Sequence, residues 1–150
     1  METSSFRILI ADNFEPWRRY ASSTLQKDES LKLVGAASDG LEAVQKAIEL
    51  KPDLVLLSIG LHKLNGIEAA NQICKAVRGV KLLFATQIID PEVMTEALSN
   101  GAHGYISKMN AECELLCAIR AIRRGETFIG SGINGSRYLY GLTQLCSFMC

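Results

Sequence analysis

Two hydrophobic patterns alternate along this chain of 150 residues, and the alternation limits the folds that it can adopt. Short apolar runs predict strands over residues 6–11, 31–37, 53–57, 80–85 and 104–106. The segments between and after them carry apolar residues at helical spacing, as in Trp17, Ala21 and Leu25, or in Leu41, Val44 and Ile48. Strands that alternate with helices favour a parallel sheet, and strands this apolar are expected to be buried on both sides. The sequence therefore predicts an α/β protein with a doubly wound, five-stranded parallel sheet and five helices.

Start signals support the predicted helices. Asp39 lies three residues before Glu42, and Asn65 lies three residues before Glu68, which is the spacing of a capping residue and an acidic partner. The segment 90–92, Asp-Pro-Glu, offers a cap, a proline for the first helical position and a negative charge for the helix dipole. Helices are therefore expected to begin just after each of these caps.

Length and charge restrict the class of protein. A chain of 150 residues suffices for one domain with a real core. Its 16 basic and 16 acidic side chains give a formal net charge of zero, so direct nucleic-acid binding is not expected. Residues 1–5 are polar and no apolar run reaches the length of a membrane span, which argues against a signal peptide and a membrane anchor. Five cysteines without the spacing of a disulfide framework favour a reduced, cytoplasmic protein.

The composition changes after about Gly125. We therefore predict one domain over residues 1–126 and a C-terminal tail over residues 127–150. The tail is expected to be a loop with a short amphipathic segment docked on the domain. It leaves no room for a helix-turn-helix DNA-binding output domain of the usual size.

Four motifs, each at the end of a predicted strand, carry the candidate site. They are Ile8-Leu9-Ile10-Ala11-Asp12-Asn13, Leu54-Val55-Leu56-Leu57-Ser58-Ile59-Gly60, Phe84-Ala85-Thr86 and Gly104-Tyr105-Ile106-Ser107-Lys108. In this order and at these separations they resemble the receiver domain of bacterial two-component response regulators, over roughly residues 6–130. The resemblance implies a flavodoxin-like fold with strand order 2-1-3-4-5 and a site at the carboxyl ends of the strands, near the switch point.

The resemblance assigns the first half of the site to four residues. Asp12 matches the first of two acidic residues that hold a magnesium ion, and Asn13 replaces the second. Ser58 stands where the family has the aspartate that accepts a phosphoryl group. Gly60 occupies the place whose backbone carbonyl completes the metal site. Because serine lacks a carboxylate, the usual acyl phosphate cannot form at this position.

The other half of the site matches the family. Thr86 corresponds to the hydroxyl residue that bonds the phosphoryl group, Tyr105 to the switching aromatic residue and Lys108 to the lysine that neutralises phosphoryl oxygens. Each has a structural alternative. Lys108 would pair with Asp12 and hold the last loop, Thr86 would suit a strand end, and Tyr105 would be an ordinary half-buried ring or a surface contact for a partner.

Charge counting predicts weak or lost magnesium binding, and therefore no cofactor. A complete site would set three carboxylates against one lysine, whereas here Asp12 faces Lys108 alone and the local charge is about zero. An amide at Asn13 and a hydroxyl at Ser58 are poor substitutes for the anionic oxygens that magnesium prefers.

Two other kinds of chemistry are less favoured. His62 lies four residues after Ser58, but Leu56 stands where the elbow of a serine hydrolase needs glycine, so the chain is not expected to be an enzyme. Cys113 with Cys117 and the pair at positions 146 and 150 could form a four-thiolate zinc site, but core or interface thiols are the preferred interpretation.

These residues predict a receiver module that lacks the chemistry of its phosphorylation site. We expect it to act by phosphorylation-independent contact with other signalling proteins, either a histidine kinase or a second copy of the chain. The alternative is a small-molecule or anion sensor that uses the vacated cleft lined by Asp12, Asn13, Ser58, Thr86 and Lys108.

Overall fold

The computed structural model describes residues 5–87 and 90–130. The strands are β1 (Phe6–Ala11), β2 (Leu31–Ala37), β3 (Leu54–Leu57), β4 (Lys81–Thr86), β5 (Gly104–Ser107) and β6 (Phe128–Ile129). The helices are α1 (Glu15–Leu25), α2 (Gly40–Leu50), α3 (Gly66–Ala76), α4 (Pro91–Ser99) and α5 (Ala111–Arg123), with a short 3-10 turn, η1 (Lys108–Asn110). Each of the five predicted strands is present, within one or two residues of its predicted ends.

The strands form one parallel sheet in the order β2-β1-β3-β4-β5-β6. This confirms the predicted doubly wound order and adds a sixth strand. In β6, Phe128 pairs with Gly104 and Ile129 with Tyr105, and both β6 residues are buried. The sheet therefore continues into the segment that was predicted to be tail. The sequence did not predict this strand, because two residues are too few to show a strand period. From residue 131 onward, the predicted docking of the tail lies outside the described residues.

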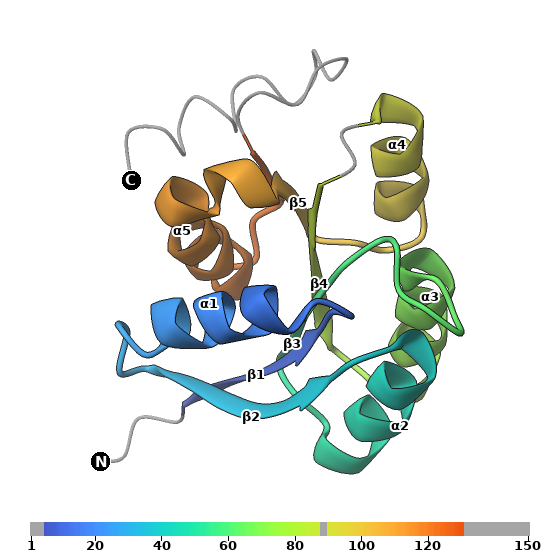
Figure 1. The fold of residues 1–150 in the computed structure, drawn as a ribbon, viewed down its shortest axis with the longest axis horizontal. Helices are drawn as coiled ribbons and strands as arrows, with labels where there is room; N and C mark the ends of the chain where they lie inside the picture. Colours follow the sequence, from blue (N-terminus) through green and yellow to red (C-terminus); the bar gives the residue numbers. More distant parts are fainter. Residues whose placement is uncertain (1–4, 88–89, 131–150) are drawn as a thin grey trace.

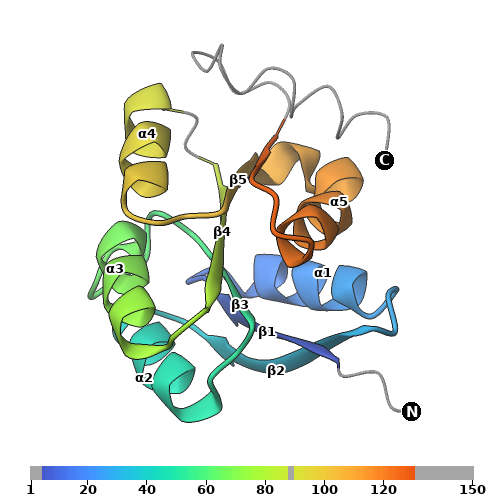
Figure 2. The same ribbon diagram turned by 180° about the vertical axis from the view of Figure 1, so that it is seen from behind.

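Helices cover both faces of the sheet (Figures 1 and 2). Helices α1 and α5 lie on one face, and α2, α3 and α4 lie on the other. Alternate residues of β1 supply the two cores, since Ile8 and Ile10 face the first pair of helices whereas Leu9 faces the other three. This explains why the strand is apolar throughout, with no polar alternation.

Side chains predicted as caps do cap the helices. Asp39 Oδ1 accepts the N–H of Glu42 at 2.8 Å, and Asn65 Oδ1 accepts the N–H of Glu68 at 2.9 Å. Asp90 caps α4 by accepting the N–H of the second helical residue at 2.9 Å. Each bond satisfies a donor that the helix itself leaves without a partner. No helix in these described ranges has the length and apolar composition needed to cross a membrane.

Helix α2 does not pack against the sheet through all of the large apolar residues that define its helical pattern. Leu41 and Ile48 are 53% and 47% exposed, whereas Gly40, Ala43 and Ala47 are buried. Small side chains let the helix approach the sheet closely, so the larger apolar residues are placed outside the contact. The helical period located this helix correctly but did not identify its buried face.

Candidate functional site at the carboxyl edge of the sheet

The carboxyl ends of β1, β3, β4 and β5 surround a cleft of about 490 Å³. Register explains the assembly: Ala11 pairs with Leu57 and Leu57 with Phe84, so the residues that follow these strands emerge side by side. The cleft is lined by Asp12, Asn13, Phe14, Ser58, Gly60, His62, Thr86, Gln87 and Lys108. It thus brings together all of the predicted site residues except Tyr105.

Asp12 and Lys108 form a nearly buried ion pair in this cleft. Lys108 Nζ lies 2.6 Å from Asp12 Oδ2, and their side chains are 12% and 4% exposed. The contact is an ion pair whose geometry falls short of a directed hydrogen bond. Asp12 Oδ1 accepts the N–H of Phe14 at 2.9 Å, and the Lys108 ammonium lies 5.1 Å from the centre of the Trp17 ring. The structure thus contains the Asp12–Lys108 pair expected under the structural alternative for Lys108.

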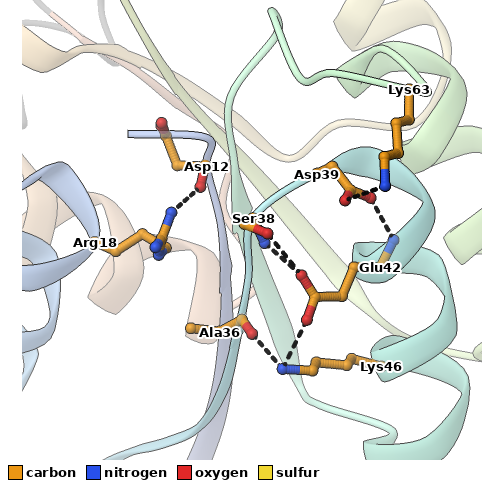
Figure 3. A network of polar contacts seen from close by, with 8 residues as sticks. All are labelled: Asp12, Arg18, Ala36, Ser38, Asp39, Glu42, Lys46 and Lys63. Carbon is orange, nitrogen blue, oxygen red and sulfur yellow. Dashed lines mark hydrogen bonds and ion pairs between the residues drawn. The ribbon is translucent and has the colours of Figure 1, made fainter. Parts of the chain in front are cut away.

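A second cation holds the main chain of the same residue. Arg18 donates from its guanidinium to the carbonyl oxygen of Asp12 at 2.6 Å, as Figure 3 shows. Arg18 comes from the first turn of α1, so the end of β1 is tied both to α1 and to the loop after β5. Asp12 is therefore held by positive charge at its side chain and at its backbone.

Asn13 is bonded through both ends of its side-chain amide. Its Nδ2 donates to the carbonyl oxygen of Gly60 at 2.8 Å, and its Oδ1 accepts the N–H of His62 at 3.0 Å. Rotating the amide by half a turn would place donor against donor and acceptor against acceptor, so the bonded groups fix its orientation. Asn13 thereby joins the end of β1 to the loop between β3 and α3.

Ser58 lines the cleft and is 8% exposed. Its N–H donates to the carbonyl of Ala11 at 3.2 Å, which continues the pairing of β1 and β3. A Cβ atom at Gly66 would lie 1.9 Å from the Ser58 carbonyl oxygen, so only glycine lets α3 begin this close. Ser58 and His62 both lie in the described part of the chain, and no hydrogen bond joins their side chains.

Thr86 and Tyr105 differ in their relation to the cleft. Thr86 lines it and is 1% exposed. Tyr105 does not line it and is fully buried in the core, with its ring 6.3 Å from that of Phe84. Burial raises the pKa of Tyr105 to about 12, and the negative charge of Asp90 adds to the effect. The ring is therefore neither half-buried nor a surface contact in this conformation.

Three residues that line the cleft, Phe14, His62 and Gln87, were not predicted as site residues from the sequence. Phe14 and Gln87 directly follow Asn13 and Thr86 and line the cleft beside them. Phe14 is 57% exposed and places an aromatic ring at the cleft. The available signal was position alone, because residues just after a strand lie at the same edge as its last side chain.

The residues of the cleft do not fit a magnesium ion. Of the described residues that line it, Asp12 is the one carboxylate, and the Lys108 ammonium already lies against it. Asn13 turns its NH₂ group, a donor, toward the Gly60 carbonyl that would serve as a ligand. Magnesium requires several oxygen ligands at about 2.1 Å, and here Asp12 Oδ1, Asn13 Oδ1 and the Gly60 carbonyl already accept hydrogen bonds from the protein's own donors.

The zinc hypothesis receives no support from the part of the chain that can be described. Cys113 is exposed and free, whereas Cys117 is buried on α5 and disulfide-bonded, so the sequence-based expectation of a reduced thiol is wrong for Cys117 and it offers no thiolate to a metal. Positions 146 and 150 lie outside the described residues. Among residues 5–87 and 90–130, no group of three or more histidine, cysteine or acidic side chains is placed to hold a metal.

Fold and cleft together are those of a receiver domain, and the comparison with protein families agrees. The family model described as the response regulator receiver domain matches residues 8–120. The chain therefore belongs to the response regulator receiver domain family.

Named relatives place it among signalling regulators. The chain is similar to the transcriptional regulatory protein LiaR of Bacillus subtilis, at 33% identity over 86% of this chain and 61% of that protein. It is 34% identical to the response regulator protein VraR of Staphylococcus aureus over 82% of this chain and 59% of the relative. The chain thus spans about three fifths of the curated relatives that it matches.

Solved structures agree with this placement. The response regulator domain of Thermotoga maritima CheB is 35% identical, with a TM-score of 0.73 over 77% of this chain and 94% of that one. A LuxR-family two-component response regulator from Aurantimonas sp. SI85-9A1 is 25% identical, with a TM-score of 0.80 over 95% and 97% of the two chains.

Proposed function

We propose that this receiver module signals without being phosphorylated, through contact with other signalling proteins. The observation that carries the proposal is the Asp12–Lys108 ion pair, at 2.6 Å, beside a serine at position 58. In this arrangement the lysine neutralises a carboxylate of the protein itself. The charge balance that a phosphoryl group and a metal ion would supply is already met internally.

The chemistry of Ser58 supports the same conclusion. A hydroxyl cannot form an acyl phosphate, and converting it to a phosphate ester requires a base or a metal to activate it. The imidazole of His62 is not bonded to Ser58, and the cleft residues do not fit magnesium. Phosphoryl transfer to this side chain is therefore expected to be negligible.

Without a phosphoryl group, the conformation of the module is set by its sequence and its partners. Tyr105, on β5, is fully buried in the core on the α2–α4 face of the sheet. A partner with different affinities for two states would shift the module between them. We expect that partner to be another signalling protein, either a histidine kinase or a second copy.

The experiment is intact-mass analysis after incubation with acetyl phosphate and magnesium. The native chain is expected to gain no phosphoryl adduct. The double variant Asn13→Asp/Ser58→Asp, which restores two carboxylates, is expected to gain one, and Ser58→Asp alone is expected to gain less. A stable adduct on native Ser58, located by fragmentation, would contradict the proposal.

A small-molecule or anion sensor is the second candidate, and the cleft of about 490 Å³ with polar walls favours it. A thermal-shift screen of small anions and metabolite-sized polar compounds tests it, because a ligand of the folded state raises the melting temperature. A hit that is lost in Thr86→Val, which alters the cleft without removing the Asp12–Lys108 pair, would favour the sensor. A screen without hits would favour protein contact.

A further inference from the structure

Asn13 occupies the position of the second acidic residue in the family pattern, yet its contacts are those of a donor as well as an acceptor. We propose that the Asn13 amide replaces the cation of an ordinary receiver as the group that holds the β3–α3 loop. Its Nδ2 binds the Gly60 carbonyl at 2.8 Å and its Oδ1 binds the His62 N–H at 3.0 Å. This inference rests on the proposed function, in which the site works without metal or phosphate.

The difference between an amide and a carboxylate carries the argument. An aspartate here could still accept the N–H of His62, but it would set a second oxygen against the oxygen of Gly60. Two facing oxygens need a cation or a proton between them, whereas the NH₂ group of Asn13 supplies a donor directly. Replacing one carboxylate oxygen by nitrogen therefore makes the closure of this loop independent of an ion.

The loop needs to be held because its backbone is not in a relaxed conformation. Lys63 has a φ of 68°, in the left-handed region that non-glycine residues rarely adopt. The N–H of Leu64 donates back to the carbonyl of His62 at 2.7 Å, and the N–H of Gly66 donates to Ile59 at 2.7 Å. A tight turn with a strained residue persists only where neighbouring contacts determine it.

The other side of the loop is fixed to the start of α2. The N–H of Gly40 donates to the carbonyl of His62 at 3.0 Å, and Lys63 Nζ lies 3.5 Å from Asp39 Oδ2. A Cβ atom at Gly40 would lie 1.8 Å from the carbonyl oxygen of Leu64, so helix and loop are in direct backbone contact. Figure 3 shows Asp39, at the N-terminus of α2, facing Lys63 of the loop.

A continuous chain of contacts thus runs from Asn13 through residues 60–64 to Gly40 and Asp39. With a carboxylate at position 13, closing this chain of contacts would require a cation or a proton between the two facing oxygens. Here the Asn13 amide keeps it closed at all times. The surface formed by the loop and the first turn of α2 is therefore presented in one conformation, whatever the magnesium concentration.

Hydrogen exchange of individual amides tests the inference in buffer without divalent cations. We compare the native chain with Asn13→Ala, Asn13→Asp and the control Asn71→Asp, which makes the same chemical change at an asparagine bonded to Asn100. Loss of one or two hydrogen bonds at Asn13 is expected to speed exchange at His62 and Gly40 about tenfold. The amide of His103, bonded to the Leu82 carbonyl at 2.8 Å, serves as the reference for global folding.

Adding millimolar magnesium then tests whether the Asn13 amide takes the place of a cation or is an ordinary loop contact. Added magnesium is expected to restore protection at His62 and Gly40 in Asn13→Asp, but not in Asn13→Ala, and to change nothing in the native chain. Unchanged exchange in Asn13→Ala would overturn the inference, as would a magnesium response of the native chain. Loss of protection in Asn13→Asp without recovery in magnesium would make Asn13 an ordinary loop contact and would overturn its equivalence to a cation.

Failure here is distinguishable from failure of the proposed function. A phosphoryl adduct on Ser58 would contradict phosphorylation-independent signalling but would leave the exchange pattern at His62 and Gly40 unaffected. Conversely, unchanged exchange in Asn13→Ala would remove the role of Asn13 while Ser58 remained unable to form an acyl phosphate.

Discussion

The two halves of the cleft are closed by different kinds of interaction. On the α1–α5 side, Asp12 and Lys108 form a charged pair whose side chains are 4% and 12% exposed. On the α3 side, Asn13 makes neutral hydrogen bonds to the backbone of Gly60 and His62 near the solvent. In both halves the polar contacts are made within the protein, but the energetic consequences of losing a partner differ.

Burial explains the difference. Removing one member of a buried ion pair leaves an uncompensated charge in a medium of low dielectric constant, which costs about 3–5 kcal/mol. Removing a neutral, partly exposed hydrogen bond costs about 1 kcal/mol, because water replaces the lost partner. The charged half is therefore expected to be the more sensitive to substitution.

The largest expected effect comes from Lys108→Met. The substitution keeps the length of the side chain and leaves the Asp12 carboxylate buried without its ammonium, so we expect the free energy of unfolding to fall by about 3–5 kcal/mol. Urea denaturation measures it. The double variant Asp12→Asn/Lys108→Met removes both charges and should recover much of the loss. A single-variant cost below about 1 kcal/mol would mean that water already solvates the pair.

A smaller effect is expected from Asn13→Ala. It removes the bonds to Gly60 and His62, both at the solvent-accessible mouth, so we expect a loss of about 1–2 kcal/mol in the same urea experiment. Because these bonds are neutral, the loss should be the same at low and high salt. A cost equal to that of Lys108→Met would break the comparison between the two halves.

The smallest effect concerns the polar contacts at the start of α2, shown in Figure 3. Glu42 accepts the N–H of Ser38 at 2.7 Å and pairs with Lys46 at 3.2 Å. The backbone bond from Ser38 lowers the pKa of Glu42; burial opposes this, and Lys46 adds to the lowering. Because the folded pKa lies below the unfolded value, Glu42 stabilises the fold above about pH 4.5, and this contribution is lost as the pH falls through the folded pKa.

Thermal unfolding at a series of acidic pH values checks the role of Glu42. Glu42→Gln should lower the melting temperature slightly at neutral pH and flatten its decrease in acid. The control is Glu49→Gln, an exposed carboxylate on the same helix. If Glu42→Gln and Glu49→Gln gave the same pH profile, the Ser38 bond would not contribute.

Sequence patterns predicted the long elements of the fold well and its small or closely packed parts less well. The apolar runs located β1 to β5, and the caps at Asp39 and Asn65 located the starts of α2 and α3. The period failed for the buried face of α2, where close packing selects Gly40 and the two alanines in place of Leu41 and Ile48. It also missed β6, whose burial depends on pairing with β5.

The candidate site was predictable as a set of residues but not as a set of contacts. Motif order identified Asp12, Asn13, Ser58, Thr86 and Lys108, and the cleft contains all five. It did not indicate Phe14 or Gln87. Nor could it show that Tyr105 is fully buried, because burial depends on residues remote in sequence.

The sequence by itself determined the positions of the long strands and helices and the chemical identity of the groups at the site, including a serine at 58 and an amide at 13. Local pattern suffices for these, since the period of apolar residues and the ends of strands are properties of short segments. The family and the strand order were predicted from the resemblance of the motifs. Only the tertiary structure decided that Lys108 lies against Asp12 and that Asn13 holds both Gly60 and His62. These contacts join residues that are 47 or more positions apart, and folding of the whole sheet is what brings them within hydrogen-bonding distance.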